Sequence, residues 1–313
     1  MIAEKKKDVI EMLIFFGITF GIDFALGIPM YINHSPSPDV YGYFMMLLPV
    51  NGAFLAQYYR KHEKSDVMIL FLMWMLLTMA FLVVSMLSGS TSLFGFEFTE
   101  ELMENYCTII SIGLLIYLIL KKKVHIFENG ELVHKDILLF IGILLMRNLI
   151  AGYSEIISGD MDVLTNAVFS VFGIVSVFLA VVMYFCEEYG WRGYLQDKLQ
   201  KRFGKRAGVV ILGILWCCWH LLWWSANIGI NSMLEVFFVG VPVTIGCSAF
   251  FGYIYIKTKN VWLCAIAHGI YNAMGIGMPD NKMYNVMTVM TGIVLCLFFL
   301  KKEYTEVKSL FPL

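Results

Sequence analysis

Long apolar runs alternate with short polar segments along the whole chain. An apolar run of roughly 17 to 25 residues is the length that crosses a bilayer as one helix. Ten such runs are present, at Val9–Tyr31, Val40–Tyr59, Val67–Leu87, Tyr106–Leu120, Ile137–Ile157, Val163–Phe185, Ala207–Ala226, Leu234–Ile256, Val261–Met278 and Tyr284–Leu300. The pattern predicts an all-α fold, a polytopic transmembrane helical bundle of about ten spans. The fourth and ninth runs are short enough to be re-entrant, which gives a range of eight to ten.

Lysine and arginine mark alternate connections between these runs. Cytoplasmic loops of membrane proteins accumulate basic residues, so alternation reports topology. Basic residues occupy Lys5–Lys7, Arg60–Lys64, Lys121–Lys123, Lys198–Arg206, Lys257–Lys259 and Lys301–Lys302, and the intervening loops carry almost none. We therefore expect an even number of spans with both termini cytoplasmic. The first run is long and ends without a small-residue cleavage site, so it is expected to be a retained anchor rather than a signal peptide.

Composition agrees with a membrane protein. Of 313 residues, 59% are hydrophobic and 15% are charged, more apolar surface than a chain this size can hide from water. No connection is long enough for a soluble domain, so residues 1–313 are expected to form a single integral membrane domain. The formal net charge of -1 and the absence of a phosphate-binding glycine loop argue against a nucleic-acid partner. The seven cysteines show no paired metal-ligand spacing and are interpreted as packing residues.

Three polar clusters interrupt the apolar runs. They are Glu187 to Arg192, Trp216 to His220, and His268 to Asn272. Ionisable groups within hydrocarbon cost several kcal/mol unless they are paired or wetted, so a chain that keeps them there is expected to use them. Counted from the basic flanks, Glu187, His220 and His268 lie at depths of roughly 17, 21 and 14 Å at the rise of an α-helix. The depths agree within about two turns, provided that the sixth helix continues past Gly190 and Gly193 toward Lys198.

Helix geometry assigns a direction to each side chain in these clusters. Residues four apart share a helix face, so Glu188 and Arg192 can neutralise each other and leave Glu187 pointing elsewhere. Trp216 and His220 share one face of their helix, and His268 and Asn272 share one face of theirs. The three helices are expected to bring Glu187, both imidazoles and Asn272 to one water-accessible cavity that opens toward the cytoplasmic half of the bilayer.

Structural explanations compete with this functional one. Charged residues near helix ends can anchor topology by snorkelling, and intramembrane histidines can join helices by hydrogen bonds. Gly17 and Gly21 form a small-xxx-small pair that predicts close helix packing. Asp23 and Arg147 are two further charges within spans, and a buried structural ion pair between the first and fifth helices is the expected reading.

The joint motif resembles a known family. Glu187-Glu188-x-x-x-Arg192, Trp216-x-x-x-His220 and His268-x-x-x-Asn272, in this order on successive helices, are similar to the CPBP family of CAAX-type intramembrane proteases. Trp216 stands where that family usually has phenylalanine. The family includes the eukaryotic prenyl-protein endoprotease and bacterial members linked to bacteriocin processing or self-immunity. The resemblance covers roughly 185–273, within an expected catalytic core of 163–278, and implies a bacterial cell-membrane location but not a prenylated substrate.

The chemistry of these residues suits peptide hydrolysis. A carboxylate beside an imidazole can take a proton from water and direct it at a carbonyl, which fits Glu187 with His220. Asn272 and His268 can donate hydrogen bonds to the resulting oxyanion from one helix face. The resemblance implies the same division of roles, with Glu188, Arg192 and Trp216 as structural support. Zinc on Glu187, His220 and His268 is one version of this site, and a metal-free glutamate mechanism is the other.

Two other classes of function use the same residues. A non-catalytic immunity or partner-binding membrane protein would keep the site as a relic, which the intact Glu187, His220, His268 and Asn272 argue against. An ion-coupled transporter would relay protons through these groups, and inverted repeats, which would favour it, are not seen in the sequence. The expected partners are therefore the lipid bilayer and a peptide or membrane-protein substrate. The sequence leaves the oligomeric state open.

Overall fold

Helices dominate the computed structural model, which describes residues 2–33, 37–88, 92–93, 96–97, 100–153, 157, 163–228, 233–275 and 282–305. The first half contains α1 (Ile2–Phe16), η1 (Gly17–Ile22), α2 (Asp23–Asn33), α3 (Pro38–Met45), α4 (Leu48–Lys61), α5 (Asp66–Ser88), α6 (Glu100–Leu120), η2 (Gly130–Leu132) and α7 (His134–Ala151). The second contains α9 (Val163–Glu188), η3 (Tyr189–Gln196), α10 (Asp197–Phe203), α11 (Lys205–Ile228), α12 (Met233–Thr258), α13 (Val261–Ala273), α14 (Lys282–Leu295), η5 (Cys296–Leu300) and α15 (Lys302–Thr305). A two-residue antiparallel pair, β1 (Ser92–Leu93) with β2 (Phe96–Glu97), is the one sheet among the described residues. The predicted all-α class is confirmed.

Several helices are long and apolar enough to cross a membrane. By length and composition, six qualify among the described residues: Lys6–Asn33, Asp66–Leu87, Glu100–Leu120, Lys205–Ala226, Val236–Thr258 and Lys282–Leu300. The fourth predicted run thus belongs to a full-length helix, whereas the ninth is the shorter apolar helix α13. The 26 residues of α9 reach about 39 Å at 1.5 Å per residue. The chain is an integral multi-pass membrane protein, and the count of ten spans stays a prediction.

The second predicted span is not one helix. The run Val40–Tyr59 divides into α3 and α4, with a turn at Met46 and Leu47. Pro49 in the first turn of α4 explains the break, because proline has no backbone N–H and its ring clashes with the carbonyl four residues earlier. Apolar content alone could not reveal this interruption.

The chain divides into two compact units. Unit 1 comprises Met1–Val124, Leu179–Tyr194 and Cys218–Val236, and unit 2 comprises His125–Phe178, Leu195–Cys217 and Phe237–Leu313. The boundaries lie between Val124 and His125 and within α9, η3, α11 and α12. The expected single membrane domain over 1–313, with a core at 163–278, stays a prediction.

In unit 1 the close packing uses glycines other than the predicted pair. Gly17 and Gly21 are exposed, and a Cβ added to either would meet nothing within 4 Å, so the expected contact at this motif is wrong. Gly52 on α4 makes the close approach instead. A Cβ there would lie 3.1 Å from the Phe15 carbonyl oxygen and 2.7 Å from Thr19 Oγ1. The small residue needed by this helix pair is thus on α4 and not on the first helix.

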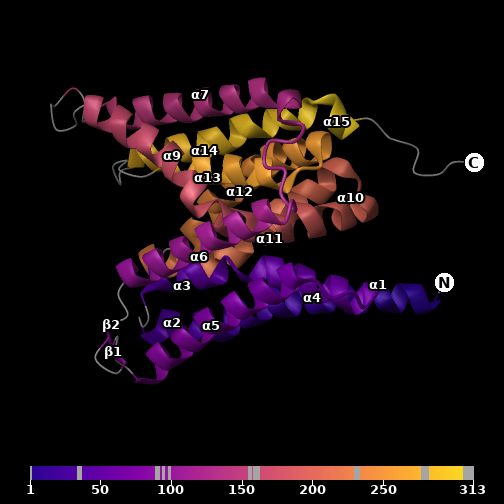
Figure 1. Ribbon diagram of the computed structural model, residues 1–313. Coiled ribbons are helices and arrows are strands. Elements are labelled where there is room, and N and C mark those ends of the chain that lie inside the picture. Colours follow the sequence, from indigo (N-terminus) through magenta and orange to yellow (C-terminus); the bar gives the residue numbers. More distant parts are fainter. Residues whose placement is uncertain are drawn as a thin grey trace, which may run out of the picture. The chain divides into compact units, whose positions relative to one another are not determined.

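Unit 2 is built around a similar crossing between α12 and α14. A Cβ on Gly246 would lie 2.6 Å from the Gly292 carbonyl carbon, so the two backbones meet directly at two glycines. Phe140 of α7 stacks on Phe250 of α12 with ring centroids 4.3 Å apart. Helices α7 and α14 also run side by side (Figure 1). Lipid is as apolar as the helix surfaces, so the hydrophobic effect does not drive helices together there. Close packing at small residues such as these glycines takes its place.

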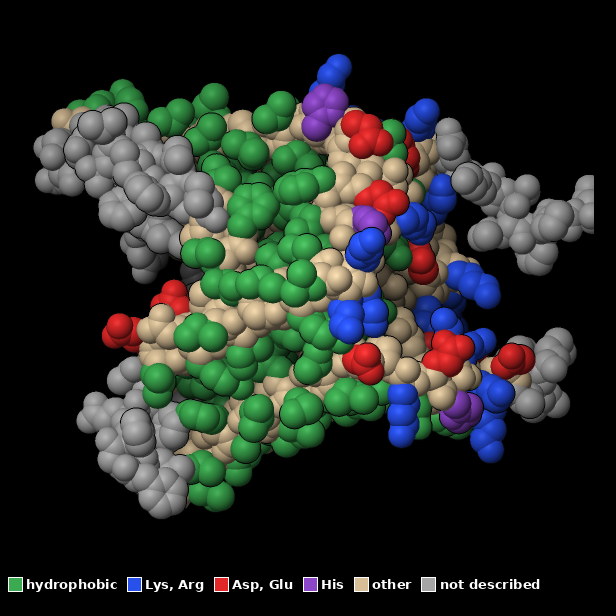
Figure 2. Space-filling view, viewed as in Figure 1, with side chains coloured by type: hydrophobic (Ala, Val, Ile, Leu, Met, Phe, Trp, Pro, Cys, Tyr) green, Lys and Arg blue, Asp and Glu red, His purple; other side chains and the backbone are tan. Residues whose placement is uncertain are grey.

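Exposed side chains along the helix middles are mainly hydrophobic. Figure 2 shows them covering most of the visible helix surface, with charged side chains gathered toward helix ends. Exposed examples are Leu13, Met73, Leu77, Ile109, Leu139, Met146, Leu149, Phe238, Val286 and Ile293. A water-soluble monomer rarely shows contiguous apolar surface on this scale. The faces of these helices contact the lipid bilayer.

Two of the predicted basic segments of unit 1 lie at the same end of their pair of helices, α1 and α4. In unit 1, Arg60 at the end of α4 forms ion pairs with Asp8 and with Glu11 of α1, the latter at 3.0 Å. The segments Lys5–Lys7 and Arg60–Lys64 are thus on the same side of the membrane, as the alternation predicted. The assignment of that side to the cytoplasm stays a prediction.

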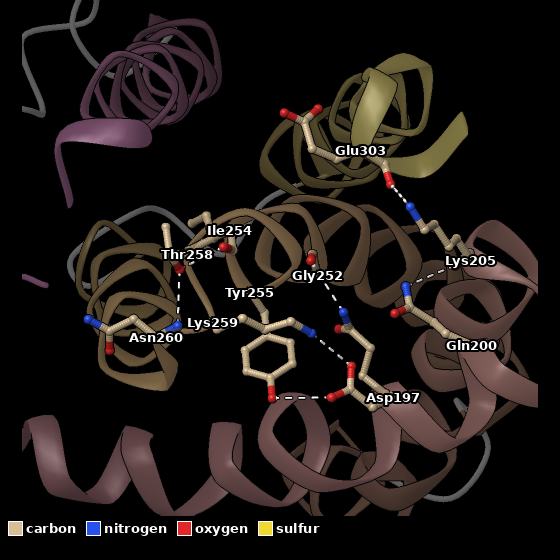
Figure 3. A network of polar contacts seen from close by, with 11 residues as sticks. Asp197, Gln200, Lys205, Gly252, Ile254, Tyr255, Thr258, Lys259, Asn260 and Glu303 are labelled. Carbon is tan, nitrogen blue, oxygen red and sulfur yellow. Dashed lines mark hydrogen bonds and ion pairs between the residues drawn. The ribbon is translucent and has the colours of Figure 1, made fainter. Parts of the chain in front are cut away.

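Unit 2 repeats this arrangement at the ends of α7, α10, α12 and η5. Asp136 lies 2.9 Å from Lys301 Nζ and 3.7 Å from Lys257 Nζ. Lys259 lies 3.1 Å from the Asp197 carboxylate, to which the Tyr255 hydroxyl also donates (Figure 3). The basic connections 198–206, 257–259 and 301–302 therefore share one end of unit 2.

Asp23 and Arg147 lie in different units, so the ion pair predicted between them stays a prediction. In unit 1, the Tyr41 hydroxyl donates to the Asp23 carboxylate at 2.7 Å. In unit 2, Arg147 donates to the Met274 carbonyl oxygen at 3.0 Å. Each charge thus has a neutral hydrogen-bonding partner within its own unit, and a sequence pattern does not reveal such partners.

Candidate active site

The acidic pair of the first cluster lies at the last turn of α9, in unit 1. Glu187 is 2% exposed and Glu188 is wholly buried. Arg192 Nη1 donates to Glu188 Oε1 at 2.8 Å, and the Arg192 side chain is also wholly buried. The predicted i,i+4 neutralisation of Glu188 by Arg192 is confirmed. Neighbouring helical residues project about 100° apart, so this pairing directs Glu187 to a different side of the helix.

A π-helix begins directly after the acidic pair. The backbone stays helical through η3 into α10, so the expected continuation toward Lys198 is confirmed, but Tyr189–Gln196 has the wider i→i+5 winding. Single π turns are rare and concentrate at functional sites. Gly190 permits the close contact here, because an added Cβ would lie 2.6 Å from the backbone carbon of Pro49. The start of α4 therefore packs directly against the turn that follows Glu187.

Two further contacts fix this turn within unit 1. The Tyr189 hydroxyl donates to the Gln57 side-chain oxygen at 3.1 Å. The Tyr194 hydroxyl donates to Glu11 Oε1 at 3.1 Å, and Glu11, 2% exposed, also accepts from Arg60. Glu11 was not among the predicted site residues. A charged residue inside the first apolar run is the sequence feature that could have indicated it.

His220 lies on α11 among tryptophans of unit 1. Its ring stacks on Trp224 with centroids 4.6 Å apart and planes at 12°, and Trp219 meets it edge to face at 4.7 Å. Trp223 is anchored by a 2.8 Å hydrogen bond from its Nε1 to the Pro38 carbonyl oxygen. These tryptophans restrict the plane of the imidazole. A fixed imidazole is what oriented proton transfer requires.

His268 lies on α13 in unit 2 and is 4% exposed. Trp216 meets it edge to face with centroids 5.3 Å apart, and Phe251 stacks on it at 5.8 Å. Trp216 therefore supports the second histidine of the motif by direct contact. Asn272 follows one turn later on α13 and is exposed. His268 and Asn272 share a helix face by their spacing, as predicted.

The two halves of the motif fall in different units. Glu187, Glu188, Arg192 and His220 belong to unit 1, whereas Trp216, His268 and Asn272 belong to unit 2. The predicted cavity, lined by all four catalytic candidates, would include residues of both units, and it stays a prediction. Unit 1 contains a buried carboxylate and an imidazole packed against tryptophans, and unit 2 contains an imidazole and a side-chain amide one turn apart on α13.

The three predicted zinc ligands lie in both units, Glu187 and His220 in unit 1 and His268 in unit 2. Among the residues that the structure describes, no three His, Cys, Asp or Glu side chains lie close enough together to hold a metal ion. Zinc at Glu187, His220 and His268 stays a prediction.

Comparison with known proteins identifies the motif-bearing segment. Residues 169–274 match the family model described as "Type II CAAX prenyl endopeptidase Rce1-like". A curated relative, "CAAX prenyl protease 2" of Methanococcus maripaludis, is 27% identical over 113 residues, 31% of this chain and 38% of the relative. The chain thus matches less than two fifths of that relative's length. No solved structure matches the chain.

Fold and motif together define the class. The chain is a polytopic α-helical membrane protein whose segment 169–274 contains all seven motif residues, from Glu187 to Asn272. That segment is similar to the Rce1-like CAAX prenyl endopeptidase family, and the match covers less than half of the chain. The resemblance drawn from the motifs is confirmed.

Proposed function

We propose that this protein is an intramembrane endopeptidase that hydrolyses a peptide bond of a membrane-associated protein or peptide. The observation that carries the proposal is the complete motif within the family segment 169–274, with Glu187 buried beside the Glu188 to Arg192 ion pair. Because the Glu188 carboxylate is paired with Arg192, we assign it a structural role and not that of the base. Glu187 keeps the capacity to accept a proton from water.

The mechanism assigns one role to each residue. Glu187, assisted by His220, takes a proton from a water molecule, and the water oxygen bonds to the scissile carbonyl carbon. His268 and Asn272 donate hydrogen bonds to the negative oxygen of the tetrahedral intermediate. The proton held by Glu187 then passes to the leaving nitrogen as the carbon–nitrogen bond breaks. Water is consumed, and an amine and a carboxylic acid are produced.

The aromatic contacts support these roles. The imidazole of His220 lies between Trp224 and Trp219, and that of His268 contacts Trp216 and Phe251. Each ring is thereby limited to a narrow range of orientations before substrate arrives. Positioning of this kind can contribute several kcal/mol to catalysis.

We further propose a bacterial cell-membrane location with both termini in the cytoplasm.

The test is comparative membrane proteomics of wild type against Glu187→Gln. This variant removes the base and keeps the shape, so a wild-type substrate should remain uncleaved while expression and insertion stay near normal. Glu101→Gln, an exposed carboxylate at the start of α6, is the matched control and should cleave normally. Identical proteomes for wild type and Glu187→Gln would refute the proposal and favour a non-catalytic binding protein.

Metal analysis of the purified protein separates the two mechanistic versions. Stoichiometric zinc that is lost in Glu187→Gln, together with inactivation by chelators, would establish the zinc version. Full cleavage by metal-free protein would establish the glutamate version.

A further inference from the structure

The helix that carries His268 and Asn272 is short. α13 has 13 residues, about 20 Å at the α-helical rise, and isolated helices of this length are marginal. Its position therefore depends on what holds its two ends. Both ends are held by side chains of unit 2 that neither the motif nor the proposed mechanism includes.

Asn260 holds the N-terminal end. It is the N-cap of α13, and its side-chain oxygen accepts from the Trp262 backbone N–H at 2.9 Å. Its amide nitrogen points the other way, toward the loop that precedes α7. It lies within hydrogen-bond distance of three carbonyl oxygens there, those of His125 at 3.0 Å, Ile126 at 3.1 Å and Glu128 at 2.9 Å. One side chain thus caps the helix and clamps a distant loop.

The turn before Asn260 reinforces this clamp. The Asn129 side chain donates to the Thr258 carbonyl oxygen at 3.0 Å, so the loop before α7 also donates a hydrogen bond to the segment that precedes α13. The Thr258 hydroxyl accepts from the Asn260 backbone N–H at 3.1 Å, which fixes the turn between α12 and α13 (Figure 3). Lys259 adopts a positive φ of 53° in this turn, a conformation that needs support from its surroundings.

Arg147 and Asn148 of α7 hold the C-terminal end. Arg147 Nη2 donates to the Met274 carbonyl oxygen at 3.0 Å, and Asn148 Nδ2 donates to the same oxygen at 2.6 Å. The guanidinium also lies 5.4 Å from the ring centres of Tyr271 and Tyr284. The last carbonyls of a helix lack partners within it and carry partial negative charge. A buried cation at that point, 1% exposed, satisfies both needs.

We propose that Asn260 and Arg147 are positioning residues that fix α13 from opposite ends and thereby set the place of His268 and Asn272 for catalysis. The inference rests on the proposed function for its catalytic part. His268 is two turns from Asn260, and Asn272 is two residues before Met274. Loss of either clamp lets one end of α13 move, and displacements of about 1 Å can cost roughly 100-fold in rate.

Asn260→Asp isolates the clamp from the cap. An aspartate keeps the oxygen that accepts from Trp262, and it is as good an N-cap as asparagine, but it cannot donate to the three loop carbonyls. Amide hydrogen exchange of 261–273 in this variant should be about tenfold faster than in wild type, as expected for the loss of buried hydrogen bonds. Glu128→Gln, which leaves the backbone carbonyl in place, is the matched control and should exchange as wild type does.

Arg147→Gln tests the other end. Glutamine keeps one amide donor but removes the cation from the helix terminus and from the two tyrosine rings. Exchange should rise in the last turn of α13, and Arg147→Lys, which restores the charge, should recover part of the loss. Lys135→Gln, at the exposed start of α7, is the control. Thermal melting of each variant in detergent reports whether the whole protein remains folded.

Cleavage kinetics provide the readout that a purely structural role would not move. Both variants should lower kcat about 10-fold to 100-fold with KM little changed, because binding precedes the step that needs the donors of α13. Wild-type exchange in α13 for both variants overturns the proposal, and so does faster exchange with an unchanged kcat. If Glu187→Gln cleaves like wild type, the proposed function fails, and the exchange measurements alone then decide whether the two clamps exist.

Discussion

Arg192 donates a hydrogen bond to Glu188 across 2.8 Å, and both side chains are wholly buried. The pair lies where α9 gives way to the π-helix η3, one residue after Glu187. Its partners are four apart in sequence, so the local backbone alone brings them together. Removing one member leaves the other as a buried charge without its counter-charge, which is far more costly than losing an exposed pair.

We therefore expect Glu188→Gln and Arg192→Ala each to lower the free energy of unfolding by about 3–5 kcal/mol. Lys259→Gln, which breaks an ion pair with Asp197 whose two side chains are 59% and 52% exposed, should cost within about 1 kcal/mol. Thermal melting in detergent measures both. The double replacement Glu188→Leu with Arg192→Met should restore much of the loss. Normal melting of the single variants would contradict a structural role for the pair.

Gly190→Ala should destabilise the protein by about 1–3 kcal/mol, because the new methyl group would overlap the backbone of Pro49. Gly142→Ala is the matched control, since nothing lies within 4 Å of an added Cβ there. The control should change stability by no more than about 1 kcal/mol, as expected from helix propensity. Melting curves of the two variants side by side decide the prediction. Equal curves would mean that α4 and η3 are not in close contact.

Asn272→Ala should lower kcat by about 100-fold to 1000-fold, the usual effect of losing one oxyanion donor. Asn272 is exposed, so its removal should leave melting unchanged. Single-turnover cleavage of the substrate identified by proteomics measures the rate. A variant that cleaves at the wild-type rate would remove Asn272 from the proposed mechanism.

Asp136 should make stability depend on pH in the acid range. Burial raises its pKa, but hydrogen bonds from Lys301 and Tyr253 and the charges of Lys301 and Lys257 outweigh burial and lower the pKa below its ordinary value. The folded state therefore holds this proton less tightly than the unfolded state does. The stabilisation is fully present above the unfolded pKa of about 3.9 and disappears as the pH falls through the lower, folded pKa. Wild type should melt above Asp136→Asn at pH 7, with the difference closing below about pH 4.

The loops around Lys61, Lys122, Lys201 and Lys257 should all be cytoplasmic. Alternating basic connections motivate this prediction, and ion pairs within each unit gather basic segments at one end. Single cysteines at the four positions, in a chain without other cysteines, should react with an impermeant reagent only from the cytoplasmic side. Labelling of any one of them from outside would break the topology.

Local contacts were predictable from the sequence wherever helix periodicity was enough. The Glu188 to Arg192 pair follows from a spacing of four, and the continuation of α9 toward Lys198 follows from the absence of proline. The π winding of η3 was not predictable, because hydropathy and spacing are nearly the same for i→i+4 and i→i+5 helices. Close packing was misassigned for a related reason. Gly17 and Gly21 have the right spacing, but the approach is made at Gly52 and Gly190, whose partners are distant in sequence.

The sequence by itself determined that this chain is an all-α membrane protein whose later helices carry a motif similar to that of CAAX-type proteases. Lipid excludes unsatisfied backbone, so long apolar runs must be helices, and polar groups within them stand out. Only the tertiary structure decided which neutral partners satisfy Asp23 and Arg147, and that Asn260 and Arg147 hold the two ends of α13. Those contacts join residues more than a hundred positions apart or on separate helices. Their energy comes from directional hydrogen bonds that exist only once the helices have packed, and no local pattern encodes that geometry.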